Sequence, residues 1–409
     1  TPLERIRAQK QVIRWDMGKG RIGPRQWVIV SPNYLRLKPK IDWRGNYVYD
    51  DEGNKIIKPV REAMPALLAI DWAAIIVDEA HQTLSGAAGE PKNQSAQRQG
   101  LGLLEVQENG LRIALTGTPF RGKHENLWGI LNWLEPKRYT TYWGWVNRNF
   151  YVYQDYMGQR IVGDLRDEKR FAEETKNLLL RRTKQEVAPE LPRKLYGGTP
   201  LFPTKSGHDK GPIAVWLDMY GTQRKSYESM AQQAMAELEG GTLMANGVLA
   251  EMIRLKQFAN SAGFMAGMDE FFPTFPSNKF DWIVDFLADR GIDGKGPGES
   301  KVIVASQFTK HIDLFAKQLR EKHKIPCFVL TGKTNERDRV ALQRDFQRGR
   351  MESGEPSPDV FLLNTKAGGT SITLDAADDV VIIDSTFNAE DQEQVEDRAH
   401  RISRVHNVT

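Results

Sequence analysis

The stretch "AAIIVDEAH" at Ala73–His81 decides the fold class, because a short apolar run ends abruptly in two carboxylates. Continuous Val, Ile and Leu runs of this length are typical of parallel strands that are covered on both faces. Parallel sheets bind ligands at the carboxyl ends of their strands, and Asp78 and Glu79 stand at such an end. The pattern alone is equally typical of a strand that ends in an acidic helix cap, which carries no chemistry.

The two carboxylates suit the chemistry of a bound triphosphate. Asp78 can hold Mg²⁺, usually through water, beside the triphosphate oxygens. Glu79 can polarise the attacking water. His81 follows them in the sequence and could couple a nucleotide site to a nucleic-acid site.

A second turn, "LTGTP" at Leu115–Pro119, follows the next buried run. Its hydroxyl groups, Thr116 and Thr118, flank a glycine and precede a proline, so they lie in a tight turn. Such a turn can sense the two acids and relay their state. Taken alone, it is also an ordinary turn.

Residues 1–140 form the first region with the strand-then-helix rhythm of an α/β sheet. Besides the two runs above, "WVIVSP" at Trp27–Pro32 predicts a short buried strand. The segment "NYVYDDEGNKIIK" at Asn46–Lys58 alternates around Asp51–Asn54, which predicts a protruding β-hairpin.

Residues 276–409 form the second such region. Its predicted strands are "KVIVASQF" at Lys301–Phe308, "CFVLTG" at Cys327–Gly332, "DVFLLNT" at Asp359–Thr365 and "DVVIID" at Asp379–Asp384. Amphipathic helices are expected between them, at Lys310–Lys322 and Asn335–Arg348. The predicted fold class is therefore α/β, with two parallel-sheet regions.

Residues 141–275 between them are predicted to be helical insertions and a linker. Helical periodicity runs through "LWGILNWLEP" at Leu127–Pro136 and "QRKSYESMAQQAMAELEG" at Gln223–Gly240. The aromatic segment "YWGWVNRNFYVYQDY" at Tyr142–Tyr156 could stack on bases. A packed helical insertion is the favoured interpretation, because aromatic residues at such spacing normally fill a core.

The segment "QVEDRAHRISR" at Gln394–Arg404 supplies positive charge. On a helix, Gln394, Arg398 and Arg401 share one face, since their spacings are four and three residues. Two guanidinium groups on that face could reach the phosphates of a nucleotide and stabilise the transition state of phosphoryl transfer. A solvated charged face is the alternative interpretation.

The segment "NTKAGGTSITL" at Asn364–Leu374 places Gly368 and Gly369 shortly after a predicted strand. Glycines let backbone amides approach a phosphate or another ligand closely. A flexible loop between strand and helix is equally consistent with the pattern.

The composition limits the remaining possibilities. The net charge of +4, from 57 basic and 53 acidic residues, permits nucleic-acid binding through a local basic channel but does not require it. The single cysteine, Cys327, excludes an intramolecular disulfide and favours a reducing cytoplasmic or nuclear setting. No apolar run is long enough to span a membrane, so no membrane partner is expected.

Taken together and in order, these segments resemble the motifs of superfamily-two helicases and, within them, of the Swi/Snf-type ATPases. "WVIVSPNYL" resembles motif Ia, "IIVDEAH" motif II, "LTGTP" motif III and "KVIVASQFTKHIDLF" motif IV. The run from Leu362 to Arg404 resembles motifs V and VI together. The segments "LLLRRTKQEVAPELPRK" at Leu178–Lys194 and "EMIRLKQFANS" at Glu251–Ser261 resemble stretches that are particular to the Swi/Snf branch.

The resemblance implies two RecA-like lobes with helical insertions, with ATP and Mg²⁺ held between the lobes and double-stranded DNA lying across both. It implies that Asp78 and Glu79 are the metal and water residues and that Arg398 and Arg401 are arginine fingers. Gln394 would contact the nucleotide. A monomeric motor that translocates along DNA, or remodels protein–DNA complexes, is expected more than one that separates strands.

The same resemblance suggests phosphate contacts with DNA, which would make binding salt-dependent and largely independent of sequence. The candidate residues are Pro32, Asn33, Gln307, Lys310 and Lys366. The basic cluster of Arg181, Arg182 and Lys184 could face DNA or the other lobe.

A phosphate loop, G-x-x-x-x-G-K-[ST], should precede motif Ia, and residues 1–409 contain none. "GKG" at Gly18–Gly20 lacks the terminal hydroxyl residue, and "GKT" at Gly332–Thr334 has Cys327 in place of the first glycine. We expect that the loop lies upstream of Thr1 and that this polypeptide alone hydrolyses ATP poorly or not at all. The alternative is a DNA-binding scaffold that is derived from the family, has lost the loop and works without nucleotide.

Overall fold

The computed structural model describes residues 27–50, 56–60, 64–84, 94–120, 123–156, 158–192, 194–195, 199–200, 213–239, 241–245, 247–265, 270–365, 372–387, 389–401 and 403–409. The chain divides into two compact units, Thr1–Arg181 and Arg182–Thr409. Each unit has its own apolar core. The two units are described separately below.

The second unit is built on a four-stranded parallel sheet. Its strands are β13 (Val302–Ser306), β14 (Cys327–Leu330), β15 (Val360–Asn364) and β16 (Asp379–Ile382). Their spatial order is β14-β15-β13-β16. Every residue of β13 and β15 is buried, as expected for the two central strands of a sheet that is covered on both faces. All four predicted strands of this region are confirmed.

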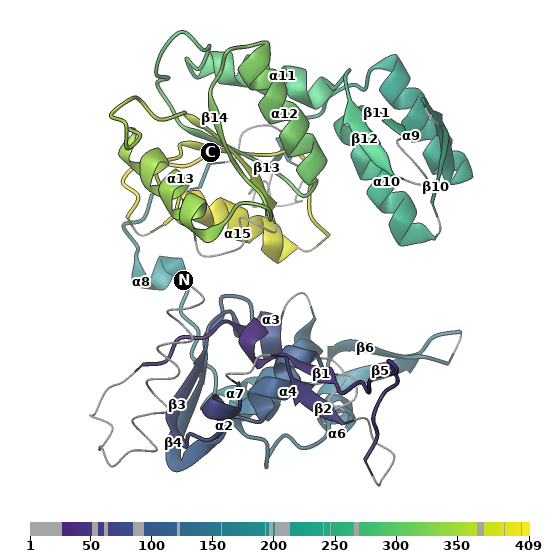
Figure 1. Ribbon diagram of the computed structural model, residues 1–409, viewed down its shortest axis with the longest axis vertical. Coiled ribbons are helices and arrows are strands. Elements are labelled where there is room, and N and C mark those ends of the chain that lie inside the picture. The colour runs from purple at the N-terminus through teal and green to yellow at the C-terminus, as the bar shows by residue number, and fades with distance from the viewer. Residues whose placement is uncertain are drawn as a thin grey trace. The chain divides into compact units, whose positions relative to one another are not determined.

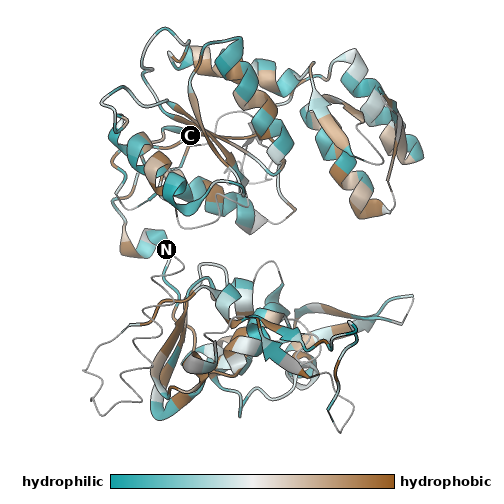
Figure 2. Cartoon of the chain, in the orientation of Figure 1, coloured by the Kyte–Doolittle hydropathy of each residue, from teal (hydrophilic) through white to brown (hydrophobic). Residues whose placement is uncertain are grey.

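Helices cover both faces of this sheet (Figure 1). Their bounds are α11 (Asn278–Asp289), α12 (Thr309–Glu321), α13 (Glu336–Arg348) and α15 (Ala389–Ala399). α11 and α12 share one core with the sheet through Phe280 and Phe315, and α13 and α15 share the other through Phe346 and Val395. The strands are apolar and the outer helix surfaces polar (Figure 2). The side chain of Asn335 caps α13 by accepting from the Asp338 amide at 2.9 Å.

The stretch from α9 to β12 forms a smaller layer of helices and hairpins in the same unit. Its elements are α9 (Gly221–Gln233), β9 (Met235–Leu238), β10 (Gly241–Met244), α10 (Val248–Asn260), β11 (Ala262–Met265) and β12 (Phe271–Thr274). The predicted helix at Gln223–Gly240 is wrong beyond Gln233. Ala234 adopts a left-handed φ of +53°, which ends the helix, and the next four residues pair with β10 instead.

The first unit contains a parallel pair of strands, β3 (Trp72–Val77) and β4 (Val106–Ala114). Its helices are α2 (Met64–Leu68), α3 (Ala80–Leu84), α4 (Ala96–Gly102), α5 (Leu127–Leu134), α6 (Tyr142–Asn149) and α7 (Glu168–Thr175). The large buried side chains of the core come mostly from α5 and α6, and they include Trp128 and Trp145. The predicted strands at β3 and β4, and the helix that begins at Leu127, are confirmed.

The segment before β3 differs from its prediction. Trp27–Pro32 was predicted to be a buried strand, but residues 27–31 form no strand, and Trp27 and Ile29 are exposed. Residues 27–31 pair with none of the described strands. The chain then forms the short helix η1 (Pro32–Leu35).

A ribbon follows, in which β1 (Leu37–Pro39) pairs antiparallel with β2 (Ile57–Pro59). Within the predicted hairpin, the Ile56 amide donates to the Val48 carbonyl at 2.9 Å, as the prediction requires. Its expected tip, Asp51–Asn54, lies outside the described residues. The neighbouring turn at Asp42–Asn46 is described, and the Asp42 carboxylate holds it by accepting from the Arg44 and Asn46 amides at 2.8 and 2.9 Å.

The aromatic segment Tyr142–Tyr156 is only half helical. After α6, the chain enters the hairpin of β5 (Phe150–Gln154) and β6 (Arg160–Leu165). Trp145 and Phe150 are buried against Phe171, which confirms that this part of the segment fills a core. Short elements are also formed at η3 (His124–Asn126), α8 (Lys184–Val187), β7 (Thr199–Pro200) and β8 (Ile213–Ala214).

The α/β fold class with two parallel-sheet regions is confirmed by these strands. The boundaries at residues 140 and 275 remain predictions. Among the described residues, no helix is both long and apolar enough to cross a membrane.

Candidate active site

The two acids of "VDEAH" lie in the turn that links β3 to α3. Asp78 is exposed, and its Oδ1 accepts a hydrogen bond from the Glu79 amide at 2.9 Å. Glu79 has a φ of +46°, in the left-handed region that residues with a Cβ seldom adopt. This backbone strain costs on the order of 1 kcal/mol or more and persists only where surrounding contacts hold it. The backbone of this turn is therefore strained, and its contacts hold the side chains in their positions.

Backbone hydrogen bonds hold this turn against the Thr-Gly-Thr turn. The Leu115 amide donates to the Val77 carbonyl at 2.8 Å, and the Ala80 amide donates to the Leu115 carbonyl at 2.9 Å. Since Leu115 follows β4 directly, the carboxyl ends of both strands are tied together. Segments about three dozen residues apart in the sequence thus form one edge, as their positions after two parallel strands predict.

A side-chain contact joins the same two turns. His81 is buried, and its Nδ1 lies 2.8 Å from Oγ1 of Thr116. That hydroxyl also accepts from the Thr118 amide at 3.1 Å, and Nδ1 of His81 lies 3.4 Å from Oε2 of Glu79. The imidazole thus stands between the predicted catalytic acid and the second turn. Oγ1 of Thr118 is buried and makes no hydrogen bond with any described residue.

The acid edge fits the water-mediated magnesium that the sequence suggests. No group of three or more His, Cys, Asp or Glu side chains gathers as a metal cage among the described residues. Mg²⁺ at a nucleotide needs no such cage, because one or two carboxylates, waters and phosphate oxygens complete its shell. Asp78 is an exposed carboxylate of this kind. When bound, the ion would neutralise charge on the phosphate oxygens.

The arginine segment of the second unit differs from its prediction in one respect. α15 ends at Ala399, so Arg401 lies beyond the helix and not on its face. Gln394 is half-buried on the helix, and Arg398 is buried. The two guanidinium groups still converge, because both donate to the Ile372 carbonyl, Arg398 at 3.3 Å and Arg401 at 3.2 Å. The two guanidinium groups were expected to meet because of helical spacing alone. In the structure, the turn after Ala399 brings them together.

Four charged side chains fasten the start of the second unit to α15. Nζ of Lys184 lies 2.7 Å from Asp397, and Nζ of Lys194 lies 2.9 Å from Asp397 and 3.1 Å from Glu396. Burial opposes the charge of Lys194, but attraction to the two carboxylates outweighs it and raises the pKa of Lys194. Burial likewise opposes the charge of Asp397, yet hydrogen bonds from the two lysines lower its pKa.

These ion pairs were not predicted from the sequence, in which Lys184 was assigned to a basic cluster that could face DNA or the other lobe. The backbone joins in, because the Leu195 amide donates to the Val408 carbonyl at 2.7 Å, and the His400 ring lies 2.6 Å from the Pro192 carbonyl. The one available signal was the excess of acids in α15, which has five Glu and Asp residues but a single arginine, Arg398. The segment that begins the second unit thus holds the helix that carries Arg398.

The predicted DNA residues lie in different surroundings. Pro32 and Asn33 are exposed on η1, and Oδ1 of Asn33 accepts from Gln97 at 3.2 Å. Lys310 is already paired, since its Nζ lies 2.7 Å from Glu270. Lys366, Gly368 and Gly369 lie outside the described residues.

The remaining candidate, Gln307, is held by a buried carboxylate. Asp384 accepts from the Gln307 amide at 2.9 Å and from the Asn260 side chain at 2.8 Å. Nζ of Lys279 reaches the same cluster through Asn260 at 2.9 Å, and burial lowers the pKa of this lysine. Nothing in the sequence marked Asp384, which stands at the end of a run predicted only as a strand.

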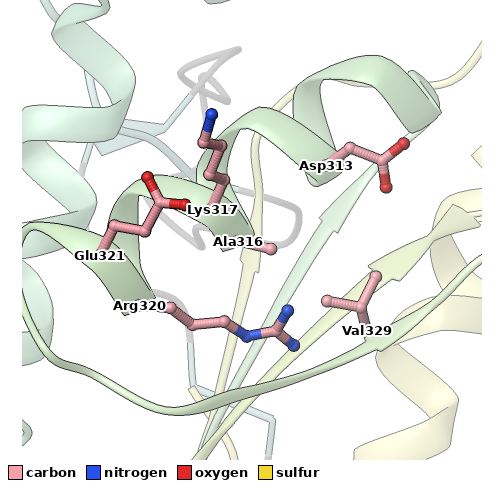
Figure 3. A pocket seen from close by; sticks show the side chains of 6 residues that line it. All are labelled: Asp313, Ala316, Lys317, Arg320, Glu321 and Val329. Carbon is pink, nitrogen blue, oxygen red and sulfur yellow. The ribbon is translucent and has the colours of Figure 1, made fainter.

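The second unit also has a pocket that other residues line (Figure 3). It is formed between α12 and β14, and its lining residues are Asp313, Ala316, Lys317, Arg320, Glu321 and Val329. The lining mixes both signs of charge, and it includes none of the predicted site residues. The acid edge and the arginine segment therefore remain the candidate sites.

Two family models match this chain, one after the other. The SNF2-related domain matches residues 53–264, and the helicase conserved C-terminal domain matches residues 278–403. The class of protein is that of the Swi/Snf-type members of helicase superfamily two, so the predicted resemblance is confirmed. Since the first model covers more than half of the 409 residues, the chain belongs to the SNF2-related family.

Curated relatives agree with this assignment. The chain is 26% identical over 365 residues to the SWI/SNF chromatin-remodeling complex subunit snf22 of Schizosaccharomyces pombe, covering 84% of this chain and 19% of that protein. It is 25% identical over 366 residues to chromodomain-helicase-DNA-binding protein 7 of Gallus gallus, covering 84% and 11%. The chain thus spans less than a third of the length of these relatives.

Among solved structures, the Sulfolobus solfataricus SWI2/SNF2 ATPase core domain is 20% identical, with a TM-score of 0.35. The match covers 84% of this chain and 63% of that one. The fold class rests on the parallel strands and the family models.

Proposed function

We propose that this chain is the motor portion of an ATP-dependent double-stranded-DNA translocase that remodels DNA or protein–DNA complexes. The observation that carries the proposal is the 2.8 Å contact between His81 and Thr116. It links the turn that carries two exposed or half-exposed acids to the next strand-end turn. A purely structural acidic cap has no need of such a link.

In this mechanism, Asp78 would hold Mg²⁺ through water, and Glu79 would orient and polarise the attacking water. The left-handed backbone at Glu79 fixes the direction of that carboxylate. His81 and Thr116 relay the state of the acids to the turn after β4, and Thr118 and Gln394 assist in nucleotide contact and coupling. Arg398 and Arg401 supply positive charge to the transferring phosphoryl group, as arginine fingers do.

The convergence of both arginines on the Ile372 carbonyl supports this role. Two guanidinium groups that meet at one neutral carbonyl concentrate positive charge there, which suits the binding of an anion. Gly368 and Gly369, which precede Ile372 by four and three residues in the sequence, remain candidates for contact with the nucleotide. The DNA track would be contacted by Pro32, Asn33, Gln307, Lys310 and Lys366, for which the Lys310 ammonium must leave Glu270.

The test compares two polypeptides, because residues 1–409 contain no phosphate loop. One is residues 1–409, and the other adds whatever in-frame upstream sequence encodes a G-x-x-x-x-G-K-[ST] loop. We expect duplex DNA to stimulate ATP turnover by the extended polypeptide only, and Glu79→Gln to abolish it. Glu105→Gln, at an exposed acid outside the site, is the matched control and leaves turnover unchanged.

Three outcomes would change the proposal. DNA-stimulated turnover by residues 1–409 alone, lost in Glu79→Gln, would show that the loop is not required. The absence of any upstream loop, together with DNA binding that ignores nucleotide, would favour the scaffold function. Stimulation by RNA but not by duplex DNA would make the protein an RNA-dependent member of the same superfamily.

A further inference from the structure

The β1–β2 ribbon of the first unit has one apolar face and one basic face. Side chains of an extended chain point alternately to opposite faces. Leu37 of β1 is buried in the core of the unit. The alternate residues Arg36, Lys38 and Lys40 are all exposed. The extended pairing includes both ends of this row, because the Val60 amide donates to Arg36 at 3.0 Å and the Lys40 amide donates to Ile56 at 2.7 Å.

A fourth cation joins the row from the neighbouring strand. Lys38 stands directly opposite Lys58 in the register of β1 and β2, and Lys58 is also exposed. Opposite residues of an antiparallel pair lie on the same face, with their Cβ atoms about 5 Å apart, so two like charges there destabilise the ribbon. The pair of Lys38 and Lys58 therefore does not stabilise the fold.

The described residues supply no counter-charge for this face. None of the four side chains forms an ion pair with them. The carboxylate of Asp42, in the adjoining turn, is occupied by the amides of Arg44 and Asn46. Within the described part of the chain, no carboxylate therefore neutralises the charge of this face.

The turn beside the row adds an aromatic side chain. Trp43 is 85% exposed, and the guanidinium carbon of Arg44 lies 4.4 Å from its ring centroid. An exposed aromatic ring stacked with arginine, next to a row of cations, is typical of a surface that binds nucleic acid. An acidic protein would account for the cations but leaves the exposed indole without a partner.

We propose that this face, made of Arg36, Lys38, Lys40 and Lys58, binds the phosphate backbone of duplex DNA. Alternate residues of an extended chain are about 6.7 Å apart, so the row from Arg36 to Lys40 spans roughly 13 Å. One strand of duplex DNA carries a phosphate for about every 3.4 Å of axis, and such a row meets several phosphates of one strand. The inference rests on the proposed function in one respect, which is that duplex DNA is the molecule along which the motor moves. It adds a contact surface beyond Pro32 and Asn33.

The test measures binding of a fluorescent duplex of random sequence to residues 1–409 across a series of salt concentrations, without nucleotide. In the double variant Lys38→Gln/Lys58→Gln, we expect affinity to fall on the order of tenfold, and the slope of log affinity against log salt to shrink by about 2. The matched control removes two exposed lysines of α7 and its end, Lys169→Gln/Lys176→Gln, and changes neither quantity.

A stability measurement separates binding from folding. Lys58→Glu places an acid opposite Lys38, so it raises the melting temperature while weakening DNA binding, whereas a structural role would lower both. Wild-type affinity and salt slope in the double variant would overturn the surface alone, and would point to an acidic protein as the partner. Failure of the wild-type chain to bind duplex DNA would overturn both this surface and the proposed DNA track.

Discussion

Apolar runs of the same kind form parallel strands in both units, but the strands are buried to different extents. In the second unit, every residue of β13 and β15 is buried, because each strand has two parallel neighbours and helices on both faces. In the first unit, β3 and β4 have only each other among the described strands. Ile76 is 42% exposed, and Leu111 and Leu115 are 60% and 49% exposed. Apolar composition therefore specifies a parallel strand, but the number of neighbours decides how far it is buried.

The difference has a consequence for the two sites. The turns of the second unit follow strands whose positions are set by packing on both faces. The acid turn of the first unit lies at the end of a thinly covered pair, so its geometry depends more on individual hydrogen bonds. The contact between His81 and Thr116 is the clearest of these bonds.

The largest expected effect tests the packing of the second unit. Phe361 is fully buried on β15, with its ring centroid 5.2 Å from that of Phe346 and 5.8 Å from that of Phe328. Phe361→Ala should lower the free energy of unfolding of this unit by about 3–5 kcal/mol, because it leaves a cavity. Ile76→Ala, in the half-exposed strand of the first unit, should cost about 1 kcal/mol. Hydrogen exchange measured by mass spectrometry on peptides of each unit would give both values.

Equal costs at the two positions would contradict the comparison. Such a result would mean that β3 is covered in solution as fully as β15. The control is Val340→Ala on α13, where the side chain is 64% exposed and the cost should be small.

The next effect is an acid sensitivity of the second unit. His311 is buried on α12, 3.2 Å from Oγ of Ser261, and burial lowers its pKa from 6.5 to about 3. Between these values, the unfolded chain binds a proton that the folded chain does not, so stability is fully present above pH 6.5 and is lost as the pH falls. The loss should approach about 1.4 kcal/mol per pH unit.

Urea unfolding of wild type and His311→Gln from pH 7 to pH 4 would measure this loss. Glutamine can still reach Ser261 but does not titrate, so the variant should show a shallower dependence on pH in the second unit. The first unit should respond alike in both proteins. Parallel pH profiles for the second unit in the two proteins would show that His311 is not the titrating group.

Much of the second unit was predictable because its signals are local and redundant. β13–β16 were recognised from continuous apolar runs, and α12 and α13 from their periodicity. The acid edge was predictable for a related reason, since residues that follow two parallel strands must meet at one edge. Composition and period were sufficient wherever the chain is packed on both sides.

Other features could not be predicted, because they depend on contacts between distant residues. Trp27–Pro32 has the composition of a strand, but a strand also requires a neighbour. The left-handed conformation of Ala234 ends α9 at Gln233. The presence of an alanine in the sequence does not predict this conformation. The fastening of Lys194 to Asp397 joins residues about two hundred positions apart. Sequence patterns within one element do not encode such pairs.

The smallest effect concerns the acid edge itself. Thr116→Val keeps the shape of the side chain but removes the hydroxyl that contacts His81 and accepts from the Thr118 amide. The Thr118 amide then loses its acceptor and His81 loses one of its contacts, so we expect the first unit to lose about 1–2 kcal/mol of unfolding free energy. Exchange should rise first in peptides that contain the two turns.

Thr118→Val provides the matched control, because it removes a buried hydroxyl that bonds to no described residue. Removing an unsatisfied buried polar group is neutral or stabilising, so this variant should be at least as stable as wild type. If the two variants behaved alike, hydrogen bonding would not be what holds the acid turn. The turn would then depend on packing, as the turns of the second unit do, and the contrast between the units would be one of burial alone.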